Sequence, residues 1–337
     1  MTVDLRSEYR FWHFADRHRE LLRARFPDVR WAVLEKETEA PDLPRSDAVL
    51  AWRFSAEQLD RAPHLRWLAC PAAGSEHLPV AEAARREVIV TRGVGYHGVP
   101  MAEHVMGLVL GFARGLFLSA ARQSVHRWWK DEVASEFRDV AGSTMTVVGC
   151  GAVGHDVARL ASAVGMRVWG VRRRPALGGS PHVERWYGSD EADDALGGAD
   201  VVVNLLPSTV STTHYFDTAR FSALRPGAVF INVGRGSTVD EAALLQALES
   251  RRVSWCGLDV TAAKPPALND PLRHHPRVVL TPKSAVFTHR YMDEAVSYFA
   301  ENLERYLAGR PLQGVVDASS DDPPTSTVAA SGSVGGR

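Results

Sequence analysis

The sequence predicts an α/β protein built on doubly wound parallel sheets. Short apolar stretches alternate with helical stretches along most of the chain. One of them, residues 144–148, runs directly into the turn Gly149-Cys-Gly151-Ala-Val-Gly154, which opens a helix that is followed by a second strand. In this setting the glycines allow a tight turn and a close approach to a pyrophosphate, so the motif indicates a Rossmann-type, dinucleotide-binding sheet. The alternative is a glycine-rich turn that binds nothing.

Composition narrows the class of protein. The 337 residues are enough for two domains, and 45% hydrophobic and 23% charged residues are typical of a globular protein. A net charge of −1 argues against binding of nucleic acid or an anionic membrane through bulk electrostatics. Three scattered cysteines, a polar N-terminus and the lack of a long apolar run favour a reduced, cytoplasmic protein without a metal site.

Residues 1–98 are expected to form a small parallel sheet with helices on both faces. Strands are expected at 31–34, 48–52, 67–70 and 88–91, and helices at 18–26 and 55–62. Two strand ends carry possible ligand-binding groups. One is Arg53, for which a solvated surface residue is the alternative, and the other is the small-residue loop 71–75, whose N–H groups suit a carboxylate.

The stretch from Pro100 to about Ser124 is predicted to be one long helix. It is apolar on nearly every turn, so it should be buried in its own core or against a second subunit. The segment 127–130 that follows is polar and aromatic, which suits a loop near a site or an interface.

The second half of the chain continues the alternation. Strands are expected at 166–171, 200–206, 228–233, 255–260 and 278–281, and an amphipathic helix at 291–307. Thr238-x-x-Glu241 is interpreted as a capping box. Residues 317–337 are rich in Ser, Thr, Gly, Pro and Asp and are expected to be a disordered tail.

Residues that could bind a ligand or take part in catalysis follow the strands expected in the second half of the chain. They are the glycine turn, Pro207, Arg235, Asp259 and Lys283. In a doubly wound sheet such ends converge on one crevice, where a dinucleotide binds.

Four motifs resemble the D-isomer-specific 2-hydroxyacid dehydrogenase family. They are VGCGAVG (148–154), INVGRGSTVDEAAL (231–244), GLDV (257–260) and LTPK (280–283), in the family's order. The resemblance extends from near the N-terminus to about residue 316. It implies a cofactor domain, 99–287, inserted into a smaller flavodoxin-like substrate domain made of 1–98 and 288–316. It also implies a homodimer formed through the helix after Pro100.

The resemblance implies roles for individual residues. Arg235 would bind the substrate carboxylate and polarise its carbonyl, which suits a planar guanidinium. Asp259 would contact the nicotinamide carboxamide, although a strand-end aspartate can instead cap the main chain. Ala73 and Gly74 would hold the substrate carboxylate through their main-chain N–H groups, and Arg53, at its strand end, is expected to contact the substrate as well. The remaining expected cofactor contacts are Gly149, Gly151, Ala152, Val153, Gly154, Leu206, Pro207, Val233 and Gly234.

Two positions depart from the family pattern. Lys283 stands where the family has a histidine, and Lys264, followed by Pro265, stands where it has a glutamate. A lysine can donate the proton for carbonyl reduction if its pKa falls from about 10.4 towards ~7–8. The added positive charge would suit a dianionic substrate such as phosphonopyruvate or an oxo-dicarboxylate. The alternative is a catalytically degenerate dinucleotide-binding regulatory or scaffold protein.

The expected cofactor is NADP(H), with NAD(H) possible. NAD-binding members place an acid about 20 residues past the glycines, whereas this chain has Arg172, followed by Arg173 and Arg174. Arginine can bind a 2′-phosphate that a carboxylate would repel. Solvated loop arginines are the alternative. The expected partners are a small 2-oxo or 2-hydroxy acid and a second copy of the chain.

Overall fold

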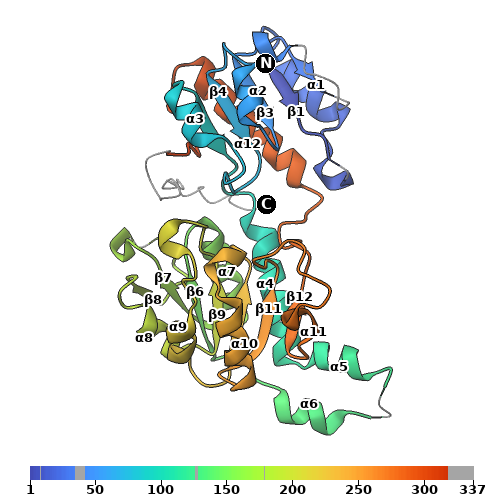
Figure 1. Ribbon diagram of the computed structural model, residues 1–337, viewed down its shortest axis with the longest axis vertical. Helices are drawn as coiled ribbons and strands as arrows, with labels where there is room; N and C mark the ends of the chain where they lie inside the picture. The colour runs from blue at the N-terminus through green and yellow to red at the C-terminus, as the bar shows by residue number, and fades with distance from the viewer. Residues whose placement is uncertain (8, 35–41, 126–127, 178, 318–337) are drawn as a thin grey trace, which may run out of the picture. The chain divides into compact units, whose positions relative to one another are not determined.

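The computed structural model describes residues 1–7, 9–34, 42–125, 128–177 and 179–317. These residues fold into two compact units (Figure 1). The terminal unit consists of residues 1–97 together with the described residues from 287 onward. The central unit consists of residues 98–286.

The terminal unit is a five-stranded parallel sheet with the flavodoxin-like order β2-β1-β3-β4-β5. Its strands are β1 Thr2–Asp4, β2 Ala32–Val33, β3 Ala48–Ala51, β4 Trp67–Cys70 and β5 Ile89–Arg92. Its helices are α1 Asp16–Arg25, α2 Ala56–Asp60, α3 Val80–Arg85 and α12 Tyr291–Leu307, with short 3-10 turns at Arg10–Trp12 and Leu43–Arg45.

The C-terminal helix α12 completes this unit, because its apolar face packs on the sheet. Trp67 of β4 is fully buried and stacks on Phe299 at 5.2 Å between ring centroids. Val316 then adds a main-chain hydrogen bond to Val90 of β5. The expected tail, apart from Asp317, lies outside the described residues.

The central unit is a seven-stranded parallel sheet in the order β12-β11-β10-β9-β6-β7-β8. Counted within the unit this is 3-2-1-4-5-6 with one further strand, the doubly wound order that binds dinucleotides where the strand order reverses. Its strands are β6 Thr144–Val148, β7 Arg167–Val171, β8 Arg185–Tyr187, β9 Val201–Asn204, β10 Ala228–Asn232, β11 Val253–Leu258 and β12 Val278–Leu280.

Helices cover both faces of the central sheet (Figure 1), which confirms the predicted fold class. One core packs α4 and α7 against the strands, and the other packs α8, α9 and α10. The helices are α4 Gly98–Ala113, α5 Leu116–Arg122, α6 Lys130–Glu136, α7 Ala152–Ala163, α8 Ala192–Gly197, α9 Thr218–Ala223, α10 Glu241–Glu249 and α11 Pro271–His274. Short 3-10 turns lie at Pro175–Leu177, Val210–Thr212 and Gly236–Thr238.

The prediction of a single long helix after Pro100 is wrong, because the structure has two helices there, α4 and α5. Gly115 adopts a left-handed φ of +65°, which ends α4 and starts α5 at an angle of 65°. Val105 and Val109 of α4 are buried in the core of their own unit, whereas Leu116 of α5 is 58% exposed. No single described helix is long and apolar enough to cross a membrane, and α4 with α5 meets that criterion only as a bent pair.

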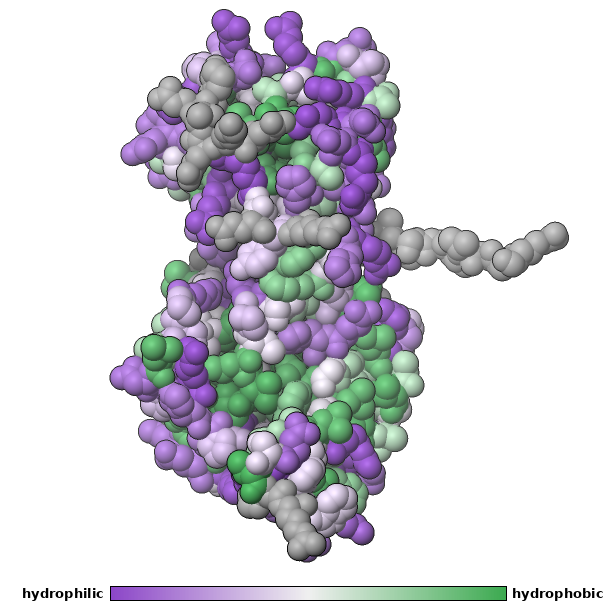
Figure 2. Space-filling view, turned by 90° about the vertical axis from the view of Figure 1, so that its right-hand side faces the viewer, coloured by the Kyte–Doolittle hydropathy of each residue, from purple (hydrophilic) through white to green (hydrophobic). Residues whose placement is uncertain are grey.

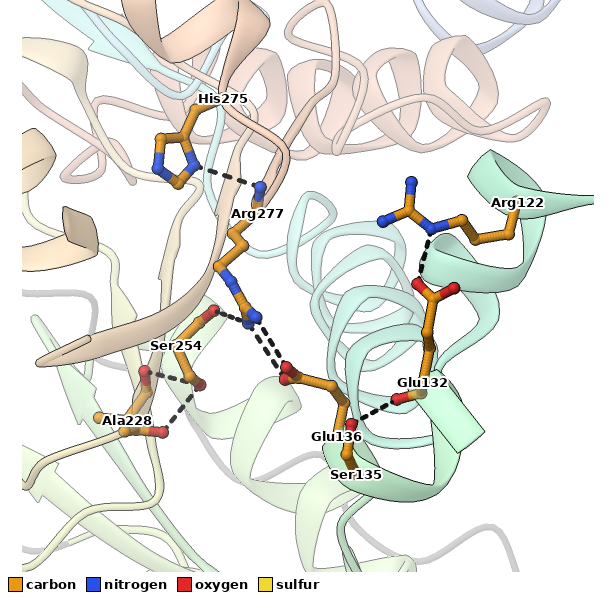
Figure 3. A network of polar contacts seen from close by, with 9 residues as sticks. Arg122, Glu132, Ser135, Glu136, Ala228, Ser254, His275 and Arg277 are labelled. Carbon is orange, nitrogen blue, oxygen red and sulfur yellow. Dashed lines mark hydrogen bonds and ion pairs between the residues drawn. The ribbon is translucent and has the colours of Figure 1, made fainter. Parts of the chain in front are cut away.

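A bidentate ion pair joins helix α6 to Arg277, the residue before β12 (Figure 3). The guanidinium of Arg277 donates to both carboxylate oxygens of Glu136, at 3.0 and 2.7 Å, and also to the carbonyl of Ser254 at 3.1 Å. These hydrogen bonds from Arg277 hold the pKa of Glu136 below its usual value. A pair with this geometry gives α6 a fixed position on its own unit.

The capping box predicted at Thr238 and Glu241 is also wrong. The helix α10 is capped by Asp240, whose carboxylate accepts the N–H groups of Ala242 and Ala243. Thr238 lies one turn earlier and is fully buried, and its hydroxyl donates to the carbonyl of Arg235. The side chain of Glu241, the second residue of the predicted box, instead accepts a hydrogen bond from the N–H of Ala262 at 2.8 Å.

Candidate functional site

The carboxyl ends of three neighbouring strands in the central unit are each followed by a predicted site residue. Arg235 follows β10, Asp259 follows β11 and Lys283 follows β12, and these strands are adjacent in the sheet. At the ordinary spacing of parallel strands, the ends of β10 and β12 lie about 10 Å apart. Long side chains from both ends can therefore reach one small molecule.

The glycine turn has the shape that a dinucleotide requires. Gly149 has a φ of +82°, and a side chain there would lie 3.0 Å from the main chain of Leu205 and Leu206. The first intrahelical hydrogen bond of α7 runs from His155 N–H to the carbonyl of Gly151, so the N–H groups of Ala152 and Val153 have no intrahelical acceptor. Such groups bind phosphate oxygens.

Cys150 within this turn is a neutral thiol. It is buried, and burial raises its pKa to about 12. The turn therefore presents no thiolate to the phosphates of a dinucleotide.

Two buried asparagines fix the main chain that follows β9 and β10. The side chain of Asn232 accepts from the N–H of Gly234 and donates to the carbonyl of Arg235, at 3.1 and 3.2 Å. The Oδ1 of Asn204 accepts the N–H of Leu206 at 3.1 Å. Its amide nitrogen links to Asn232 at 3.1 Å, so one network fixes the strand ends that carry Leu206, Val233 and Gly234.

Arg235 is half-buried on a rigid main chain. Its carbonyl accepts hydrogen bonds from the side chains of Asn232 and Thr238, at 3.2 and 2.6 Å. One guanidinium nitrogen donates to the carbonyl of Gly234 at 2.9 Å. A guanidinium carries its N–H donors in a planar fork, and this geometry matches that of a carboxylate.

Asp259 adopts the capping role that the sequence left as an alternative. Its carboxylate accepts the hydroxyl of Thr281 at 2.6 Å and the N–H groups of Ser284 and Ala285 at 2.8 and 3.0 Å. The residue is only 5% exposed. It therefore fixes the turn that carries Lys283.

Lys283 has a strained main chain that this turn enforces. Its φ is +56°, in the left-handed region that non-glycine residues rarely adopt. Its N–H donates to the carbonyls of Asp259 and Thr281, both at 3.0 Å. Strain that hydrogen bonds maintain is common where a side chain must be presented to a ligand. The residue is exposed.

His104 belongs to the same group of residues and was missed by the sequence-based site. Its Nε2 lies 3.1 Å from the hydroxyl of Thr281 and 3.8 Å from the carboxylate of Asp259. Because that hydroxyl donates to Asp259, the Nε2 of His104 must be the donor to it. Burial lowers the pKa of His104, and the charge of Asp259 partly opposes this.

The other sequence-predicted residues occupy separate places. Lys264 is exposed on the loop after β11. Arg172 follows β7 and stacks on Trp186, whereas Arg173 and Arg174 are exposed. In the terminal unit, Arg53 is exposed after β3.

Ala73 and Gly74 follow β4 in the terminal unit. The carbonyl of Ala73 accepts from Arg92 at 2.5 Å, which fixes the loop. Within the described part of the chain, the N–H groups of Ala73 and Gly74 donate to no protein acceptor. Two adjacent N–H groups of this kind can bind an anion.

Residues 106–285 match the family model of the NAD-binding domain of D-isomer-specific 2-hydroxyacid dehydrogenases. The chain belongs to this dehydrogenase family. The glyoxylate/hydroxypyruvate reductase B of Citrobacter koseri is 32% identical over 295 residues, which are 86% of this chain and 90% of that protein.

Solved structures agree with this assignment to the dehydrogenase family. A family protein from Aeromonas salmonicida has a TM-score of 0.80 at 28% identity, covering 94% of this chain and 98% of that one. A dehydrogenase from Xanthobacter autotrophicus in complex with NADPH and MES has a TM-score of 0.79 at 28% identity, covering 94% and 97%.

As a dehydrogenase of this family, the protein is an oxidoreductase that uses a nicotinamide dinucleotide and acts on small 2-oxo or 2-hydroxy acids. This favours the enzyme over the regulatory alternative.

Three of the residues that sequence reasoning did not place in the site share one weak sequence signal. Asn204 and Asn232 are polar residues at the last position of an otherwise apolar strand. Thr281 likewise follows the apolar β12.

Proposed function

We propose that this dehydrogenase reduces a 2-oxo acid to the 2-hydroxy acid with NADPH, with Lys283 as the proton donor. The observation that carries the proposal is the presence of Arg235 and Lys283 on strand ends at the same sheet edge as the dinucleotide turn. The resemblance of the motifs, which places Arg235 at the family's catalytic arginine, supports it.

When bound, the nicotinamide would supply the hydride that reduces the carbonyl carbon of the substrate. Arg235 binds the carboxylate and the reacting carbonyl oxygen, and its charge stabilises the negative charge that develops on that oxygen. The Lys283 ammonium donates one proton to the oxygen and takes one back from solvent, to which the residue is exposed. The Asp259 carboxylate keeps the turn of Lys283 in place during these steps.

Phosphates of the dinucleotide would be held by the first turn of α7, at Ala152, Val153 and Gly154. The Gly149–Gly151 turn, Leu206, Pro207, Val233 and Gly234 would line the remainder of the cofactor. Arg172 after β7 favours NADP over NAD, and Arg173 and Arg174 add positive charge there. The NADPH complex of the Xanthobacter relative supports this preference.

A substrate with a second anionic group would suit the positive charge of the site. Lys264 and Lys283 replace a glutamate and a histidine of the family pattern, so the local charge is more positive. In the terminal unit, we propose that Arg53 and the N–H groups of Ala73 and Gly74 bind a carboxylate.

We also propose a cytoplasmic homodimer. Apolar side chains are exposed on and beside α5 and α6, among them Leu116, Trp128 and Phe137, at 58%, 75% and 50%. Figure 2 shows apolar surface on the face of the central unit from which these helices project. A second copy of the chain would cover this surface.

The test is the oxidation of NADPH by a panel of mono- and dianionic 2-oxo acids. Replacement of Lys283 by alanine should lower kcat by about 10²–10⁴-fold without changing the dissociation constant of NADPH. Lys264→Ala should mainly raise KM for dianionic acids. Wild-type turnover by Lys283→Ala would overturn the proton-donor role, and a preference for monoanionic acids would overturn the dianionic substrate.

A further inference from the structure

Three unpartnered nitrogen atoms lie on residues beside the glycine turn. They are Nε2 of His155 and Nε and Nη2 of Arg172, all buried and without a hydrogen-bond partner among the residues that the structure describes. His155 is in the first turn of α7, and Arg172 is the first residue after β7. Buried polar groups are nearly always hydrogen-bonded, so a cluster of unpartnered donors points to a missing acceptor.

Trp186 of β8 holds both side chains in place. The guanidinium carbon of Arg172 lies 4.4 Å from the centroid of the Trp186 ring. The His155 ring meets the same indole edge-on, with centroids 6.1 Å apart. The indole in turn covers the main chain of Gly170, where a Cβ would lie only 2.6 Å from the ring. The two basic groups are therefore positioned by one rigid aromatic side chain.

The positive charge of Arg172 acts on His155 more strongly than the negative charge of Asp156. Burial lowers the pKa of His155, and the charge of Arg172 lowers it further, whereas Asp156 raises it. The carboxylate of Asp156 lies against Gly98 of α4 and accepts from Arg159 at 3.5 Å. Trp186 carries no charge. An anion bound between Arg172 and His155 would satisfy their donors and stabilise a protonated imidazole.

We propose that His155 holds the 2′-phosphate of NADP together with Arg172, and that binding places a proton on His155. The ribose 2′-position of a dinucleotide lies at the end of the second strand of this fold, which here is β7. The inference rests on the proposed NADP preference and adds a second ligand residue. It follows that the affinity for NADP increases as the pH falls, whereas the affinity for NAD does not.

The test is calorimetric titration of the protein with NADP and with NAD at pH 6.5, 7.5 and 8.5. Between pH 8.5 and 6.5 the wild-type dissociation constant for NADP should fall about tenfold, with net proton uptake measured in buffers of different ionisation enthalpy. His155→Gln should weaken NADP binding at pH 6.5 and flatten this dependence. Since the 2′-phosphate itself titrates near pH 6, the variant also corrects for that contribution.

His275→Gln is the matched control. Burial also lowers the pKa of His275, but the residue precedes β12, at the sheet edge opposite the turn. This variant should keep the wild-type pH dependence. A preference for NADP with an unchanged pH dependence in His155→Gln would overturn the inference alone. Tighter binding of NAD than of NADP by the wild-type protein at every pH would overturn the cofactor proposal as well.

Discussion

Asp259 shows how one buried carboxylate can position the turn that carries Lys283, the proposed proton donor. It accepts one hydroxyl and two main-chain N–H groups, and its own carbonyl accepts the N–H of Lys283. A carboxylate saturated in this way holds its donors firmly, since each charge-assisted hydrogen bond is stronger than a neutral one. The left-handed main chain of Lys283 depends on this support.

Replacement of Asp259 by asparagine should therefore disturb both stability and catalysis. The new amide group would face N–H donors with a donor of its own, at a cost of about 1–3 kcal/mol in the free energy of unfolding. The turn would move and kcat for 2-oxo acid reduction should fall. Thermal denaturation and steady-state kinetics measure the two effects.

Asp270→Asn provides the control for that experiment. Asp270 caps α11 by accepting the N–H of Leu272 at 2.9 Å. Asparagine caps a helix N-terminus about as well as aspartate, so this replacement should leave both the melting temperature and kcat nearly unchanged. An Asp259→Asn variant with the wild-type melting temperature and kcat would show that the turn does not depend on this carboxylate.

For individual residues, the sequence predicts the positions that follow from the spacing of strands and motifs along the chain. Arg235 and Lys283 follow recognisable strands, so the sequence correctly expects them at strand ends. His104 is different, because it meets Thr281 from a helix 177 residues earlier in the chain. A contact between residues so far apart in the sequence depends on how α4 packs, and no local sequence pattern predicts this packing.

Helix α6 shows the same contrast at the level of an element. Only three of its seven residues are apolar or small, so hydrophobic periodicity does not identify it. Its position depends on Arg277, which lies 141 residues away and donates to Glu136 through both terminal nitrogens. Helix α12, in contrast, carries a long apolar pattern and is found at the residues predicted.

The Arg277–Glu136 pair should decide whether α6 stays folded on its unit. The two side chains are 15% and 25% exposed, so removing one charge leaves the other poorly solvated. Glu136→Gln should lower the free energy of local opening of α6 by about 1–3 kcal/mol. Hydrogen exchange of residues 130–136 measures it.

The expected pH dependence of this element has a definite sign. Hydrogen bonds from Arg277 lower the folded-state pKa of Glu136, so the pair stabilises α6 above the unfolded value near 4.5 and loses this effect as the pH falls through the lower folded value. Glu132→Gln is the control, because its pair with Arg122 is 40% and 38% exposed. Equal hydrogen-exchange effects of the two replacements would contradict the anchoring role.

For the whole molecule, the sequence is sufficient for the fold class but not for the details of either sheet. The alternation of strands and helices predicts parallel strands joined by right-handed crossovers, but it allows more than one strand order, and the two sheets of this chain differ in theirs. Short edge strands such as β2 and β8, of two and three residues, have too few positions to show a period. The break between α4 and α5 at Gly115 was not predicted, because the apolar pattern continues on both sides of this glycine.

Buried and half-buried histidines give the folded chain a shared sensitivity to acid. Burial lowers the pKa of His18, His104, His155 and His275 below 6.5. The unfolded chain therefore takes up protons near pH 6.5, and the folded chain only at lower pH. Stability is then complete above about pH 6.5 and decreases as the pH falls towards the folded-state values.

The melting temperature should accordingly fall between pH 7.5 and 5.5, before most carboxylates titrate. A difference of one bound proton is worth about 1.4 kcal/mol per pH unit, which is roughly 3–6 °C in a unit of this size. His104→Gln keeps a donor for Thr281 but cannot be protonated, so it should reduce this slope. His289→Gln, at an exposed position, should not. A melting temperature that is constant over this range, or a wild-type slope in His104→Gln, would contradict the assignment of acid sensitivity to buried imidazoles.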